Sequence, residues 1–182
     1  VGQMLAAKAA ETSMKVSLEL GGNAPFVILS DGDVEKAVQA VSDAKLRNGG
    51  QVCIAPNRFI VHESKKDAFV EGVVKRFAEL KLGEGTDPAT DLGPLALRDQ
   101  QEKVRDLVDD AVKRGAKVEC GGKIPDLGGA LSDGYFFEPT VLTDVPEDAD
   151  IVREEIFGPV VAVTTFTDDE HAIEQANDTI FG

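Results

Sequence analysis

The stretch "PFVILSDGDVEKAVQAVSDAKLRNGGQVCIAPNRFIVH", residues 25–62, places a strand, a helix and a second strand in succession. Its first six residues are apolar enough for a fully buried strand, and Asp31 or Asp33 is placed to cap the helix that follows. That helix carries apolar residues at helical spacing: Val34, Ala37, Val38, Val41, Ala44 and Leu46. Gly49-Gly50 ends the helix, and residues 57–62 form the next strand. This order predicts an α/β fold.

The alternation of strands and helices continues on both sides of this stretch. Residues 15–20 alternate apolar and polar side chains, which predicts a strand with Glu19 on its polar side. Ser64 and Asp67 resemble a capping box for a helix that carries Phe69, Val73 and Phe77. The further predicted elements are a helix at 98–113, strands near 117–119, 135–143 and 159–166, and a last helix, capped by Asp168 or Asp169, that reaches Asn177. We therefore expect one α/β domain over residues 1–182, a three-layer αβα sandwich.

Composition limits the classes of partner and compartment. Lys and Arg total 19 against 33 Asp and Glu, a net charge of −14, which argues against general attraction to nucleic acid or anionic membranes. Two cysteines are too few for a disulfide scaffold, and no signal segment or membrane span is visible in the sequence. These features predict a cytoplasmic protein. Because the sequence begins at Val1 and ends at Gly182 within an expected turn, we expect a piece of a longer polypeptide.

Cys53 is the candidate nucleophile. A thiol reacts as thiolate, and a helix end, a cation or backbone amides favour that form. Cys53 follows a helix that ends in glycines, Gly49 and Gly50 allow the backbone to approach a substrate, and the Cys53 amide can donate to an oxyanion. These features alone leave a second interpretation open, in which Cys53 is a small buried residue at the start of a strand.

Three motifs in order resolve this choice: "LELGGNAP" at 18–25, "GQVCIAPNR" at 50–58 and "EEIFGPV" at 154–160. Together they resemble the aldehyde dehydrogenase superfamily, whose members carry an LELGG glutamate, a GQxC cysteine and an EEIFGP cofactor motif in this order. The spacing of Glu19 and Cys53 is also that of the family, and the likeness covers the whole chain. The resemblance implies the catalytic domain of an aldehyde dehydrogenase-like fold.

The resemblance assigns roles residue by residue. It implies that Cys53 attacks an aldehyde and forms a thiohemiacetal that becomes a thioester, and that Glu19 activates the hydrolytic water. Glu155 inherits contact with a ribose of NAD or NADP, and Phe157 inherits packing near the nicotinamide. Gly21, with Gly22, is implied to keep the backbone low beside that ring. His62 and His171 are not spaced as metal ligands, so we expect no metal site.

Arg47 bears on the substrate. Family members that act on succinate semialdehyde often read "FRNxGQxC" and use this arginine to hold the distal carboxylate, which a guanidinium matches in a bidentate way. The resemblance thus favours succinate semialdehyde. The alternative is that Arg47 is a helix-end cation facing the helix dipole. In that case the substrates are uncharged aldehydes.

Other outcomes remain open at this point. In a CoA-acylating relative, coenzyme A takes the thioester, and Glu19 argues against it because such enzymes often lack this base. A non-catalytic protein on the same scaffold is disfavoured by the joint presence of Cys53 and Glu19. Ala55 occupies the place where some members carry a second cysteine as a redox switch, and Cys120 is expected to be a structural thiol. No phosphate-binding glycine loop follows a strand in this sequence. The resemblance implies that the nucleotide-binding and oligomerisation segments lie outside this chain and that the whole protein is a homo-oligomer, so we expect the isolated chain to be inactive.

Overall fold

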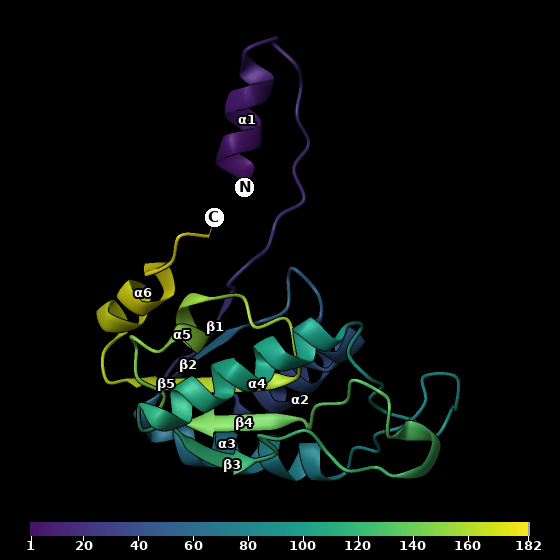
Figure 1. Ribbon diagram of the computed structural model, residues 1–182. Helices are drawn as coiled ribbons and strands as arrows, with labels where there is room; N and C mark the ends of the chain where they lie inside the picture. Colours follow the sequence, from purple (N-terminus) through teal and green to yellow (C-terminus); the bar gives the residue numbers. More distant parts are fainter. Residues whose placement is uncertain (182) are drawn as a thin grey trace.

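A five-stranded sheet forms the centre of the molecule in the computed structural model, which describes residues 1–181 (Figure 1). The strand order is β1-β2-β5-β4-β3, and β1, β2, β5 and β4 pair in parallel, whereas β3 is antiparallel to β4. The strands are β1 (Pro25–Ile28), β2 (Arg58–His62), β3 (Lys117–Cys120), β4 (Thr140–Thr143) and β5 (Val160–Phe166). The α/β prediction is confirmed.

Helices cover both faces of the sheet and make three layers. On one face, Phe59, Val61 and Val161 pack against α2 (Val34–Lys45) and α3 (Glu63–Ala78). On the other face, Leu142 and Val160 pack against helices α4 and α5, and α6 lies over Ile60. These helices are α4 (Arg98–Lys113), α5 (Asp150–Arg153) and α6 (Asp169–Asn177), and the short 3-10 turns are η1 (Arg47–Gly50) and η2 (Gly129–Leu131). Two cores, one on each side of the sheet, hold the domain together.

Local capping signals were reliable where they involve one side chain. Asp33 accepts a hydrogen bond from the Lys36 amide at 3.1 Å, and Asp168 accepts one from the His171 amide at 3.0 Å. The helix predicted at 98–113 has those bounds. The Ser64 capping box is wrong, because α3 begins one residue after His62, whose ring nitrogen Nδ1 accepts from the Ser64 amide at 3.2 Å.

The strand predicted at 15–20 is wrong. These residues are exposed and irregular, and they lead from α1 (Gly2–Ala10), which buries none of its residues and stands away from the sheet (Figure 1). Alternating side chains form a strand only when a neighbouring strand pairs with the backbone, and no strand of residues 1–181 does so.

Two further strands are smaller than predicted. β1 is an edge strand, so Val27 is 39% exposed and residues 25–30 are not a fully buried strand. The strand predicted at 135–143 is reduced to β4, because the preceding residues run along the sheet without pairing.

Candidate functional site

The Cys53 turn lies between η1 and β2, at the end of the sheet from which the loop of residues 21–24 enters β1. Asn48, Gly49 and Gly50 have φ of 53°, 65° and 75°, a left-handed path that glycine adopts without strain. The chain turns back sharply there and presents Cys53 as an exposed free thiol. The Cys53 amide makes no hydrogen bond with other residues of 1–181. The prediction of a thiol on a glycine-permitted turn is confirmed.

The three motifs meet at Gly21 and Gly22. The Gly22 amide donates a hydrogen bond to Glu155 Oε1 at 3.1 Å, and a Cβ on Gly21 would lie 2.6 Å from Glu155 Oε2. A Cβ on Gly22 would overlap the carbonyl oxygen of Cys53. Gly22 is therefore required by its close approach to the backbone of the thiol turn, whereas a side chain at Gly21 would displace the Glu155 carboxylate.

The turn after Glu155 also contacts the thiol turn. A Cβ on Gly50 would overlap the carbonyl oxygen of Gly158, so the two turns touch through backbone. Phe157 has φ of 55°, an unusual conformation for an aromatic residue. Gln100 of α4 stabilises it by donating from Nε2 to the carbonyl oxygens of Ile156 and Phe157 at 2.9 and 3.0 Å. The backbone of Phe157 is thus fixed two residues after Glu155, and its side chain is half-buried.

Glu19 and Arg47 are less constrained. Both side chains are exposed, and neither forms a hydrogen bond or ion pair within residues 1–181. Glu19 is three residues before Gly22, so its Cα lies within about 11 Å of the Cα of Gly22, which touches the thiol turn. Arg47 begins η1 and shares a loop with Cys53. The chain connectivity brings both residues to the same end of the sheet, and no direct contact joins them to Cys53.

A buried polar layer beneath these turns was not predicted from the sequence. Asn23, Lys45 and Asn57 are 3%, 0% and 2% exposed, and Lys45 Nζ donates to Asn57 Oδ1 at 3.3 Å. Burial lowers the pKa of Lys45 to about 7, against a smaller opposing effect of the Glu155 carboxylate. Arg58, also buried, donates from Nε to the Asn23 carbonyl oxygen at 3.0 Å.

Comparison with known proteins points to the same family as the three motifs that meet at this site. The model of the aldehyde dehydrogenase family matches residues 1–182. The chain belongs to the aldehyde dehydrogenase family. A succinate-semialdehyde dehydrogenase [NADP(+)] of Mycolicibacterium paratuberculosis is 44% identical over 181 residues, which are 100% of this chain and 37% of that protein.

Two further relatives of this aldehyde dehydrogenase domain differ in the substrates they are named for. A glutarate-semialdehyde dehydrogenase of Pseudomonas putida is 43% identical over 182 residues, 100% of this chain and 36% of its own length. The crystal structure of a betaine aldehyde dehydrogenase from Staphylococcus aureus in complex with NAD+ superposes with a TM-score of 0.90 at 40% identity, over 100% of this chain and 36% of that one. The chain thus spans little more than a third of the length of these relatives.

Lys103 of α4 also contacts the turn that carries Glu155. In this aldehyde dehydrogenase domain its Nζ donates to the Glu155 carbonyl oxygen at 2.8 Å and lies 3.7 Å from the Glu154 carboxylate. Its position on α4, three residues after Gln100, gives it the same face of the helix, and this i, i+3 relation is the signal that could have identified it. The α4 face therefore supports the 154–157 turn with two side chains.

The structure also contains groups that lie away from this site. The half-buried Cys120 thiol ends β3 and lies 3.8 Å from the Pro139 carbonyl oxygen, and burial raises its pKa, as expected of a structural thiol.

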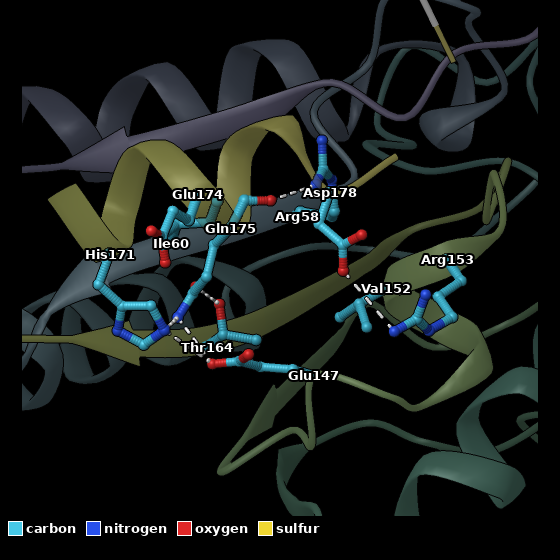
Figure 2. Close-up of a pocket in the computed structure, with 10 residues that line it drawn as sticks. All are labelled: Arg58, Ile60, Glu147, Val152, Arg153, Thr164, His171, Glu174, Gln175 and Asp178. Carbon is cyan, nitrogen blue, oxygen red and sulfur yellow. Dashed lines mark hydrogen bonds and ion pairs between the residues drawn. The ribbon is translucent and has the colours of Figure 1, made fainter. Parts of the chain in front are cut away.

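Figure 2 shows a cavity between α6 and the sheet in which Gln175 donates to Glu147 at 2.9 Å and accepts from Thr164 at 3.0 Å. His171 also lies 3.3 Å from Glu147, and Arg153 lies 3.6 Å from Asp178. Residues 1–181 contain no helix long and apolar enough to cross a membrane.

Proposed function

We propose that the enzyme containing this chain oxidises an aldehyde to a carboxylic acid with NAD or NADP, and that Cys53 is its nucleophile. The observation that carries the proposal is the junction at Gly22, which donates to Glu155 on one side and touches the Cys53 carbonyl on the other. Residues far apart in the sequence thus place a thiol, a carboxylate and close-packed backbone at one end of the sheet. The family membership and the names of the relatives support the same activity.

The reaction consists of two halves on Cys53. The thiolate sulfur bonds to the carbonyl carbon, and the oxygen becomes an alkoxide to which the Cys53 amide, unpaired within residues 1–181, is free to donate. NAD or NADP, when bound, supplies the hydride acceptor that converts this adduct to a thioester. Glu19 then takes a proton from water, the hydroxide adds to the thioester carbon, and the carbon–sulfur bond breaks to release the acid and the thiolate.

The residues at the junction fit a nicotinamide cofactor. The Glu155 carboxylate is half-buried and keeps one oxygen, Oε2, outside the Gly22 hydrogen bond, so it can accept from a ribose hydroxyl. Phe157, fixed by Gln100, offers an apolar ring beside it. Relatives named for NADP and solved with NAD+ support either cofactor.

We infer that the substrate is an acid semialdehyde, and we propose succinate semialdehyde as the first candidate within this class. Arg47 is exposed on the loop that carries Cys53 and forms no ion pair within residues 1–181, so its guanidinium is available to a carboxylate. The relatives named for succinate and glutarate semialdehyde favour this class. The relative named for betaine aldehyde favours the second candidate, a broader range of aldehydes without a carboxylate.

Substrate kinetics test this inference. We expect kcat/KM of the full-length enzyme to favour succinate semialdehyde over butanal by about 100-fold, near 2.7 kcal/mol, and Arg47→Ala to lose that preference. Arg76→Ala, which removes an exposed arginine on α3, is the matched control. If Arg47→Ala keeps the full preference for succinate semialdehyde over butanal, Arg47 is a helix-end cation and does not bind the substrate.

Two further measurements test the reaction type and the domain content. Added coenzyme A should not be acylated, because Glu19 directs water to the thioester; formation of acyl-CoA would instead identify a CoA-acylating enzyme. The chain of residues 1–182 alone should show negligible turnover, because the cofactor platform is expected outside it. Readily measurable NAD-dependent oxidation by that chain would refute this domain assignment. We expect the full-length enzyme to be cytoplasmic. We also expect it to be a homo-oligomer, and its mass in solution tests the oligomeric state.

A further inference from the structure

Glu155 is held from both sides by one buried amide. Asn57 Nδ2 donates to the Glu154 carbonyl oxygen at 2.8 Å, and Asn57 Oδ1 accepts from the Ile156 amide at 3.2 Å. These are the backbone groups immediately before and after Glu155. The backbone of Glu155 is therefore fixed by Asn57, and its side chain points to Gly21 and Gly22.

The same amide connects this turn to the loop that follows Gly22. Asn57 Nδ2 also donates to Asn23 Oδ1 at 2.9 Å, and Asn23 Nδ2 donates to the Val152 carbonyl oxygen at 3.0 Å. The glycine loop and the Glu155 turn thus share one set of hydrogen bonds. A rotation of the Asn57 amide would break contacts to both.

Lys45 supplies a second donor to the oxygen atom of that amide, in addition to the Ile156 amide. Its Nζ, fully buried on the last turn of α2, donates to Asn57 Oδ1 at 3.3 Å and is attracted by the Glu155 carboxylate. A donor at this position requires that oxygen, and not the NH₂ group, of Asn57 to face Lys45. The Asn57 Nδ2 atom is then left to face Glu154 and Asn23, as observed.

The burial of Lys45 lowers the stability of the fold, whereas a buried apolar residue in the same place would not. An ammonium removed from water is strongly destabilising unless it is paired, whereas an apolar side chain of similar length fills the same space without that cost. Asn57 Oδ1 would still accept from Ile156 if Lys45 were replaced, so no acceptor would be orphaned. Lys45 reinforces an orientation that the Ile156 amide and the Glu154 carbonyl oxygen also require, and we explain its burial by this contribution rather than by stability.

We propose that Lys45 is a positioning residue for Glu155, which acts through Asn57 to set the carboxylate for the cofactor ribose. The inference rests on the proposed function, because it takes Glu155 as the ribose contact. It predicts that removing the Lys45 amine weakens cofactor binding without weakening the fold. A merely structural residue would show the opposite result.

The test uses the full-length enzyme and the variant Lys45→Met, which keeps an unbranched stem and removes the three donors. Lys75→Met is the matched control, because Lys75 is exposed on α3 and the chemical change is identical. We expect the dissociation constant of NADP, measured by calorimetry without turnover, to rise about tenfold in Lys45→Met, while kcat at saturating NADP changes less than about threefold. The urea midpoint should not fall. If the wild type prefers NAD, NAD replaces NADP as the probe.

A second variant separates the hydrogen bond from the charge. Lys45→Gln is neutral and retains an amide donor for Asn57 Oδ1, so its affinity for NADP should lie between the wild type and Lys45→Met. A dissociation constant for Lys45→Met within about twofold of Lys75→Met would overturn the proposal. Failure of both Lys45 variants to fold would also overturn it, because Lys45 would then be a requirement of the core. If the wild type neither binds nicotinamide cofactors nor oxidises an aldehyde, the proposed function itself fails, whatever the variants show.

Discussion

Replacing Lys45 with methionine should change how the stability of the domain depends on pH. The Lys45 side chain is fully buried, and its pKa of about 7 lies below the ordinary 10.5, so the folded state holds fewer protons than the unfolded state between these values. The free energy of unfolding therefore rises with pH through this window, and below about pH 7 the full cost of the buried charge is present. From pH 6 to pH 9 the contribution of Lys45 rises by roughly 2 to 3 kcal/mol.

Urea unfolding of the chain at pH 6, 7.5 and 9 measures this contribution as a difference between variants. Lys45→Met should be more stable than the wild type, with an advantage that is largest at pH 6 and shrinks by roughly 2 to 3 kcal/mol at pH 9. Titration of other groups cancels in the difference, and Lys75→Met should show no such trend. A difference between wild type and Lys45→Met that stays constant within about 0.5 kcal/mol across this range would refute the reasoning.

Three other substitutions test the geometry of the site. Gly22→Ala should abolish activity and destabilise the fold by about 1–3 kcal/mol, because the added methyl group would overlap the Cys53 carbonyl oxygen; an active, stable variant measured by kinetics and urea unfolding would contradict this packing. In the full-length enzyme, Glu19→Gln should keep a rapid first turnover of NADP reduction and lose about 100-fold or more in the steady state, and stopped-flow absorbance separates the two phases. Gln100→Leu should raise KM for the cofactor several-fold, because it removes both hydrogen bonds that fix Phe157; an unchanged KM would show that the turn keeps its shape without them.

The fold was predictable where local signals and tertiary packing agree. The helix at 98–113 shows strong helical periodicity, and the Asp33 and Asp168 caps depend only on amides three residues away, so the sequence contains the whole signal. The segment 15–20 has a similarly clear alternation, but a strand also needs a partner, and alternation says nothing about one. The burial of residues 25–30 was overestimated for the same reason, because sequence does not reveal which strand is at an edge.

The site was predictable as motifs and not as contacts. Cys53 and Glu155 were identified from the family resemblance, but Asn57 meets Glu154 and Ile156 across nearly a hundred residues, a relation that no local pattern reports. Lys45 did have a signal. It follows Val41 by four residues and therefore lies on the buried face of its helix, where a lysine is unusual.

The most direct test of Cys53 as the nucleophile is to identify the residue that carries the acyl group. The full-length Glu19→Gln variant, mixed with succinate semialdehyde and NADP and quenched in acid, is digested and analysed by mass spectrometry, with Cys53→Ser in the same background as the control. We expect a succinyl thioester on the peptide that contains Cys53. This adduct should depend on NADP and be absent in the control. An adduct on Cys120, or NADP reduction by the Glu19→Gln variant with its Cys53 unmodified, would contradict the assignment of Cys53 as the nucleophile.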